Sequence, residues 1–175
     1  MMVITQIILL NVLWFASVLG AANGLLMPAV VATSLLLAVI FIYQGFDSQD
    51  AKIIGISVLM GLLIDGFLSS SGWLVYAMHG HQVSFLPPVW IMLLWVGFGA
   101  TIKTGMSWMF ASPLLGSVFM LIGAPLSYYS ASRLGGVELL QLWPVMITIG
   151  ISWLVYFLIL TLITNQTEQR DDVLA

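Results

Sequence analysis

The sequence predicts an all-α polytopic membrane protein, a bundle of about six transmembrane helices with both termini in the cytoplasm. Of its 175 residues, 61% are hydrophobic and only 6% are charged, whereas a soluble domain is about 45–50% apolar and about 25% charged. A soluble fold of this length leaves too much of its chain exposed to hide so much apolar surface. We therefore expect lipid to cover the excess.

Six apolar stretches are each about long enough to cross the hydrocarbon core of a bilayer, which takes roughly 20 helical residues. Three of them begin on proline, at Pro28, at Pro87-Pro88 and at Pro144. Proline suits the first turn of a helix, where its missing N–H has no partner to lose. The predicted spans are 3–22, 26–46, 51–69, 87–103, 108–130 and 143–164, followed by a polar cytoplasmic tail at 165–175.

The few basic residues give the orientation. With six spans, Lys52, Lys103 and Arg170 share the side of the termini, and only Arg133 lies on the other side. Cytoplasmic loops carry the excess of Lys and Arg in membrane proteins, so we expect that side to be the cytoplasm. The first span could also be a cleaved secretory signal, with small residues at 20–22, but no basic residue precedes it and its apolar run is long. We interpret it as a retained helix.

Two local features add to this map. The connection at 70–86 contains Trp73, Leu74, Val75 and Tyr76, so we expect it to lie on or re-enter the membrane surface, where aromatic residues are favoured. Pro125 falls inside the fifth span and should bend it, because proline removes a helical hydrogen bond.

Asp65 is the most informative single residue, because it lies within the apolar third span. A carboxylate inside a membrane is costly, so it usually faces a bundle interior, a cavity or a partner. One interpretation is a substrate, ion or proton site. The other is a structural carboxylate that is hydrogen-bonded to a neighbouring helix or paired with Arg133. We expect Asp65 and Arg133 to lie close together at the periplasmic end, lining the most polar pocket of the protein.

Further candidate binding residues flank this pair. Arg133 follows Tyr128 and Tyr129, and an arginine in that setting either binds an anionic head group or anchors the helix end at the interface. Asn11, in the first span, can bond across helices. His79 and His81 lie in the outer loop. They could provide only two ligands of a metal site, so a solvated loop is the simpler interpretation.

Several functions are excluded or disfavoured. No cysteine is present, so disulfides, thiolate nucleophiles and iron–sulfur clusters are excluded. The net charge is -3 and no basic stripe exists, so we expect no nucleic-acid partner. No phosphate-binding loop, nucleophile elbow or metalloprotease motif occurs. We assign no catalytic residue, metal or cofactor, and expect membrane lipids as partners, together with a homodimer or another membrane protein.

Two long motifs suggest a family. The segment 87–95 (PPVWIMLLW) and the segment 123–135 (GAPLSYYSASRLG) resemble a family of small bacterial inner-membrane proteins known only as a domain of unknown function. The resemblance covers nearly the whole chain and implies an inner-membrane location. Genes resembling cyclopropane-fatty-acid synthases and flavin amine oxidases often accompany that family, which implies a role around lipid modification or envelope stress. The family has no assigned catalytic residues to carry over.

A weaker similarity concerns the third span. Residues 61–69 (GLLIDGFLS), followed by Gly72, resemble a pattern in the rod-shape-determining membrane protein of the cell-wall elongation machinery, whose fold is similar to that of energy-coupling-factor substrate-capture subunits. Three functions follow as hypotheses. The favoured one is a small-molecule or lipid binding or transport subunit with a polar pocket at the periplasmic side. The alternatives are a non-catalytic scaffold or accessory subunit and a lipid-modifying enzyme.

Overall fold

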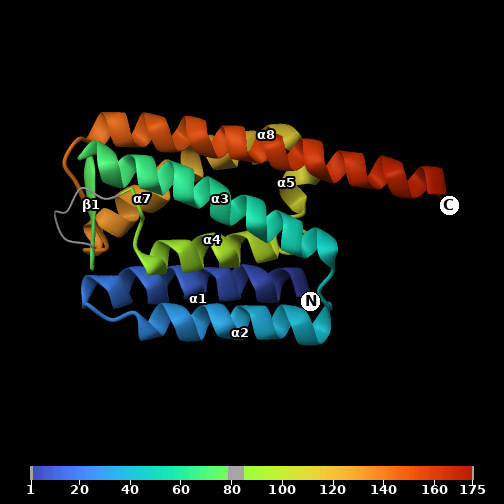
Figure 1. Cartoon of the computed structure of the whole chain (residues 1–175), viewed down its shortest axis with the longest axis horizontal. Coiled ribbons are helices and arrows are strands. Elements are labelled where there is room, and N and C mark those ends of the chain that lie inside the picture. Colours follow the sequence, from blue (N-terminus) through green and yellow to red (C-terminus); the bar gives the residue numbers. More distant parts are fainter. Residues whose placement is uncertain (1, 79–84, 175) are drawn as a thin grey trace.

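The computed structural model describes residues 2–78 and 85–174 and is dominated by helices (Figure 1). Two three-residue strands, β1 (Leu74–Tyr76) and β2 (Val137–Leu139), are the described extended segments. The helical elements are α1 (Met2–Ala22), α2 (Met27–Tyr43), α3 (Ser48–Ser71), α4 (Val89–Thr101), α5 (Trp108–Ala111), α6 (Pro113–Val118), the π-helical turn η1 (Phe119–Gly123), α7 (Ala124–Arg133) and α8 (Leu142–Leu174).

The chain is a multi-pass helical membrane protein. Four helical segments are long and apolar enough to cross a membrane, namely α1, α3, the run Pro113–Arg133 and the Leu142–Thr164 part of α8. The helices α2 and α4 are also apolar but shorter. With 13 residues, α4 is only about 20 Å long at 1.5 Å per residue. Each predicted span thus has an apolar helix, while the number of crossings and the orientation stay predictions.

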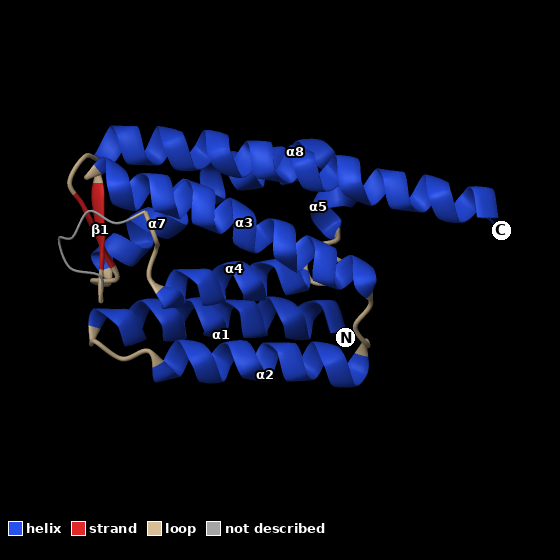
Figure 2. Cartoon of the chain, in the orientation of Figure 1, coloured by secondary structure: helices blue, strands red, loops and turns tan. Residues whose placement is uncertain are grey.

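The helices run roughly alongside one another in two groups (Figure 1). Helix α1 packs on α2 and α4, while α8 packs on η1 and α7; α3 joins the groups by packing on both α4 and α8. The two strands lie together at one end of the bundle, which we call the sheet end (Figure 2). The opposite end, where α3 begins and Lys103 follows α4, is called the Lys103 end.

The predicted fifth span at 108–130 contains a break that was not predicted from the sequence. The chain breaks at Ser112, whose backbone is extended (φ -135°, ψ 83°), and restarts with Pro113 in the first turn of α6. A residue before proline is pushed out of the helical region, which explains the break. Pro125, where the sequence predicts a bend, lies in the first turn of α7, directly after the π-helical turn η1. Gly150 of α8 lies against this turn, and a Cβ there would be 2.8 Å from the Leu121 carbonyl oxygen.

The connection at 70–86 also differs from the prediction. Leu74 pairs with Leu139 and Tyr76 with Val137 in an antiparallel two-stranded sheet, which an all-α expectation did not include. Leu74 and Tyr76 are each 1% exposed, so the rest of the protein buries these two side chains, while Trp73 and Val75 are half-buried. The expected contact of this connection with the membrane surface stays a prediction. The indole N–H of Trp90 donates to the Ala77 carbonyl at 3.0 Å and holds the sheet on α4.

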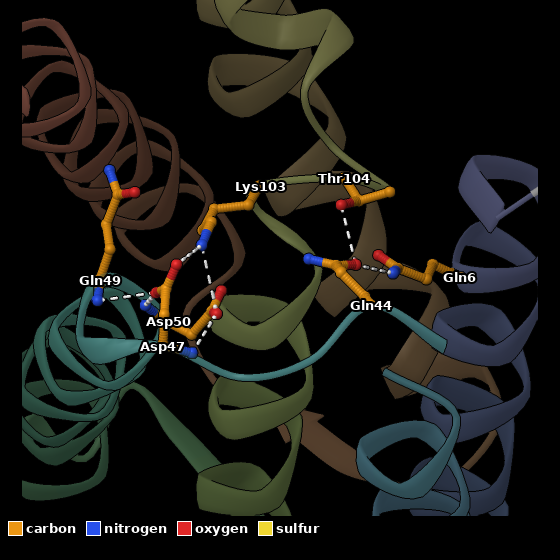
Figure 3. A network of polar contacts seen from close by, with 7 residues as sticks. All are labelled: Gln6, Gln44, Asp47, Gln49, Asp50, Lys103 and Thr104. Atoms are coloured by element: carbon orange, nitrogen blue, oxygen red, sulfur yellow. Dashed lines mark hydrogen bonds and ion pairs between the residues drawn. The ribbon is translucent and has the colours of Figure 1, made fainter. Parts of the chain in front are cut away.

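Polar side chains hold the Lys103 end together (Figure 3). The Lys103 ammonium lies 2.7 Å from the Asp47 carboxylate and 3.2 Å from that of Asp50, and Asp47 and Asp50 form a capping box at the start of α3. The hydrogen bonds from Lys103 and from the Asp50 backbone lower the pKa of Asp47 to about 2. Partial burial opposes the charge of Lys103, but its bonds to both aspartates outweigh this and raise its pKa.

A second set of contacts at the same end ties α1 and α2 to the turn after α4. Gln6 is fully buried. Its amide donates to the Gln44 side chain at 2.7 Å and its carbonyl accepts from the Gly105 backbone at 2.9 Å. Thr104 donates to the same Gln44 oxygen at 2.9 Å (Figure 3). The turn that carries Lys103 is therefore tied to α1, to the end of α2 and to the start of α3.

Candidate functional site

The carboxylate of Asp65 is the centre of the most distinctive polar cluster. Asp65 is 0% exposed. Its Oδ1 accepts hydrogen bonds from the Tyr76 hydroxyl at 2.5 Å and from the Tyr128 hydroxyl, and its Oδ2 accepts from the Trp95 indole at 2.5 Å. The four residues belong to α3, β1, α4 and α7, so one carboxylate joins four elements, with partners 11, 30 and 63 positions away in the sequence. Together they are called the Asp65 cluster.

A glycine makes room for the indole of this cluster. Gly61 precedes Asp65 by four residues and therefore lies on the same face of α3. A Cβ at Gly61 would overlap the Trp95 ring. Without a side chain there, the ring of Trp95 can lie flat enough against α3 to place its N–H on Asp65. The sequence Gly61-Leu-Leu-Ile-Asp65 thus couples a close helix contact to a hydrogen bond.

Neutral donors surround the carboxylate. Three hydrogen bonds to one carboxylate can offset much of the cost of removing it from water. Burial, together with the Asp65 charge, raises the pKa of Tyr76 well above its usual range, so this hydroxyl keeps its proton and its role as a donor. The arrangement can stabilise a negative charge inside an otherwise apolar bundle.

Stacked aromatic rings extend the cluster toward α8. The rings of Trp95 and Trp153 stack with centroids 4.5 Å apart, and Tyr156 meets Trp95 edge-on at 5.3 Å. The hydroxyl of Tyr156 lies 2.6 Å from Ser57 Oγ on α3. Offset stacking and edge contacts are the favoured geometries of aromatic pairs. Trp95 is therefore held in place by its ring contacts as well as by its bond to Asp65.

A cavity of about 360 Å³ lies next to the Asp65 cluster, between α1 and α4 on one side and the η1–α7 segment and α8 on the other. We call it the aromatic cavity, because eight aromatic side chains line it: Trp14, Phe15, Trp90, Trp95, Phe98, Phe119, Tyr128 and Trp153. Trp95 and Tyr128 belong to both the wall of the cavity and the Asp65 cluster. The carboxylate therefore lies directly behind this wall.

The mouth of the aromatic cavity lies between α1 and η1. Phe15 of α1 and Phe119 of η1 both line it, and they are 50% and 41% exposed. Each occupies the inner part of an apolar helical segment long enough to cross a membrane. The cavity consequently opens at the side of the bundle, between two helical segments that are long and apolar enough to cross a membrane.

Comparison with known proteins gives the chain a family. A family model described as "Protein of unknown function (DUF2878)" matches residues 3–159. The chain belongs to this family. No curated protein and no solved structure matches it. The match includes every residue of the Asp65 cluster and of the aromatic cavity, and it confirms the resemblance to a domain-of-unknown-function family.

The structure separates the predicted site residues of this DUF2878 protein into three sets. Asn11 and Tyr128 line the aromatic cavity, and the Asn11 amide also donates to the Ile7 carbonyl at 2.8 Å. Tyr129 and Arg133 lie outside it, in a shallow hollow at the sheet end that Glu138 also lines. His79 and His81 fall outside the described residues. Within those residues, no group of three His, Asp or Glu side chains could hold a metal ion.

The predicted pairing of Asp65 with Arg133 is wrong. Arg133 is exposed, and its guanidinium lies 5.8 Å from the centre of the Tyr129 ring, whereas Asp65 is fully buried among three neutral donors. Consecutive helical residues point in different directions, so Tyr128 turns inward to Asp65 while Tyr129 stays outside. The salt bridges within the described residues join Lys103 to Asp47 and Asp50 only.

Sequence reasoning missed Tyr76, Trp95 and Trp153 as site residues. Tyr76 lay in a connection expected at the membrane surface, and the two tryptophans matched ordinary packing positions. The available signal was chemical: a buried carboxylate requires donors, and Tyr and Trp are the side chains that bring a donor into an apolar interior. The indole N–H of Trp153 is itself buried without a hydrogen-bond partner among the described residues, and Trp153 lines the aromatic cavity.

Proposed function

We propose that this protein is a binding or transport subunit for a small hydrophobic or amphipathic molecule, such as a lipid, which enters the aromatic cavity from the bilayer. The observation that carries the proposal is the cavity itself, with its mouth between Phe15 and Phe119 at the level of the acyl chains. Ligand sites are typically concave and apolar with a few polar groups, and have volumes of about 300–1,000 Å³. The cavity fits the lower end of that range.

The polar groups at its wall suit such a ligand. Asn11, Ser127, Ser130 and Tyr128 lie among the apolar lining, and the indole N–H of the lining residue Trp153 is buried without a hydrogen-bond partner among the described residues. A few polar groups in an apolar site fix the orientation of a ligand. The proposed site therefore differs from the expected polar pocket at the periplasmic side, because it is mainly apolar and opens to lipid.

The proposed setting is the bacterial inner membrane, with the Lys103 end in the cytoplasm and the sheet end in the periplasm. Lipids are the proposed surroundings and the source of the ligand. A translocation path needs more walls than this bundle offers, so transport would require a homodimer or an energising membrane protein. A scaffold would not need a ligand in the cavity, so measuring whether a ligand binds there distinguishes a binding subunit from a scaffold.

The test fills the cavity and follows ligand binding. Bromine on an alkyl chain quenches tryptophan on contact, so a bromine-terminated decanol reports occupancy beside Trp90, Trp95 and Trp153. We expect saturable quenching in the wild-type protein in nanodiscs and its loss in Ser127→Phe, which narrows the cavity. Leu126→Phe is the matched control, because Leu126 is the preceding residue of α7, is 57% exposed and does not line the cavity.

The outcomes separate the functions. Saturable quenching in the wild type and in Leu126→Phe, with loss in Ser127→Phe, supports a binding subunit. Quenching that never saturates, or that is the same in all three proteins, means that the probe only samples the lipid-facing surface. That result would overturn the proposal and favour the scaffold.

A further inference from the structure

The lining of the aromatic cavity contains eight aromatic side chains and no charged side chain of either sign among its described residues. The nearest charged group that the structure places against this wall is the Asp65 carboxylate, which accepts hydrogen bonds from the lining residues Trp95 and Tyr128. We propose that the ligand is a lipophilic cation, an apolar body that carries an amine or a quaternary ammonium group. This inference rests on the proposed function and specifies the chemical class of its ligand.

Aromatic rings attract cations through the negative faces of their π-systems, most strongly in tryptophan, and the attraction grows where water is excluded. Four of the eight rings that line the cavity are tryptophans. Aromatic cages of this kind are a common solution for binding quaternary ammonium groups. A cavity that served neutral chains alone would have no need for such a concentration of indoles, since aliphatic side chains bury chains equally well.

The Asp65 charge adds a second attraction. No described cationic side chain serves as its counter-ion, because Lys103 is paired with Asp47 and Asp50 at the other end, Arg133 is exposed over Tyr129, and Lys52 is exposed near the start of α3. Opposite charges interact strongly where the local dielectric constant is low. A cation bound against Trp95 and Tyr128 would supply the missing positive charge across a single layer of side chains.

A phosphate-bearing lipid anion on Arg133 is the competing ligand. Arg133 lies outside the aromatic cavity, in the hollow that also contains Glu138, whose carboxylate would repel an anion. Anchoring of α7 by Arg133 at the sheet end needs no ligand. The charges that surround the cavity therefore favour a cation over an anion.

Three probes with the same decyl chain test the charge of the ligand: decyltrimethylammonium, decanol and decyl phosphate. Each competes with bromodecanol for the wild-type protein in nanodiscs of a zwitterionic lipid. We expect decyltrimethylammonium to bind on the order of ten-fold more tightly than decanol, which corresponds to a cation–π and charge attraction of about 1.4 kcal/mol. Decyl phosphate should bind most weakly.

A variant locates the source of this preference. In Asp65→Asn we expect the ratio of the affinities for decyltrimethylammonium and decanol to fall, because the negative charge behind Trp95 and Tyr128 is removed. Asp47→Asn is the control, because it removes a carboxylate at the Lys103 end and should leave the preference intact. The wild-type comparison needs no variant, so the inference stays testable if Asp65→Asn does not fold.

Each result has a distinct meaning. Equal affinities for the three probes overturn the inference while leaving the proposed function standing. A preference for decyltrimethylammonium that survives Asp65→Asn supports the cationic ligand and assigns its attraction to the aromatic rings. Tightest binding of decyl phosphate overturns the inference and points to Arg133. Absence of saturable binding by any probe overturns the proposed function as well.

Discussion

Removing the carboxylate of Asp65 should be among the most destabilising single changes in this protein. In Asp65→Ala the hydroxyls of Tyr76 and Tyr128 and the indole N–H of Trp95 all lose their acceptor. A buried polar group without a partner costs about 1–3 kcal/mol. Three such groups give an upper sum of about 9 kcal/mol, and relaxation toward one another or toward water lowers it. We expect a loss of about 3–5 kcal/mol, which corresponds to about half of that upper sum.

Asp65→Asn separates the individual contacts. The side-chain carbonyl of the new asparagine can accept hydrogen bonds from both tyrosines. Its NH2 group then faces the Trp95 N–H, so two donors meet where the wild type has a hydrogen bond. The expected loss is about 1–3 kcal/mol. Adding Trp95→Phe removes the opposed donor, so the double variant should cost less than the sum of the single variants.

The assay is reversible unfolding in mixed micelles, followed by the circular dichroism of the helices. The double-variant cycle measures the coupling between Asp65 and Trp95, and Asp47→Asn provides a carboxylate control at the Lys103 end. A change of less than about 0.5 kcal/mol in Asp65→Ala, the range of ordinary surface substitutions, would refute the conclusion that the Asp65 cluster holds the four elements together.

Three further predictions follow from the same contacts. Asp65→Asn and Arg133→Gln should have additive effects on the free energy of unfolding, because the two side chains share no partner. A coupling energy above about 0.5 kcal/mol would show that Asp65 and Arg133 do interact. The pKa of Asp47 is about 2 in the folded protein and 3.8 ordinarily, so its contribution should be present above about pH 4 and lost as the pH falls toward 2. Melting temperatures of the wild type and Asp47→Asn should converge over that window, and a constant gap would contradict the assignment. Gly61→Ala should lower the melting temperature and shift the Trp95 fluorescence, because its methyl group would overlap the indole; Gly55→Ala, which meets nothing within 4 Å, is the control.

The sequence was sufficient to predict where the helices lie, but not where the chain breaks between or within them. Apolar length and the prolines at 28 and 88 located the helix starts within about two residues. The break at Ser112 required knowing that Pro113 begins a new helix rather than bending an existing one. The strands β1 and β2 are three residues long and exist only because they pair with each other across about 60 positions of the chain, so no local pattern announces them.

The sequence allowed us to predict the acceptor of the site, Asp65, but not the set of side chains that donate hydrogen bonds to it. Asp65 stood out because a carboxylate in an apolar span requires a partner, and Tyr128 was identified beside Arg133. The choice of Arg133 as the partner followed from charge alone, whereas the structure satisfies Asp65 with neutral hydroxyl and indole donors from β1, α4 and α7. The aromatic cavity has no sequence signature, since its lining comes from elements that meet only in the folded bundle.

Photo-crosslinking in native-like membranes tests the central claim, that the aromatic cavity receives a hydrophobic ligand from the bilayer. A decyl chain with a terminal diazirine would be activated in nanodiscs that contain the protein, and the labelled residues would be mapped by mass spectrometry. The account predicts adducts concentrated on the cavity lining, at Phe15, Phe119 and Ser127, and their loss in Ser127→Phe. Adducts spread evenly over lipid-facing side chains, such as Phe41 and Ile42 of α2, which are 68% and 70% exposed, would contradict it.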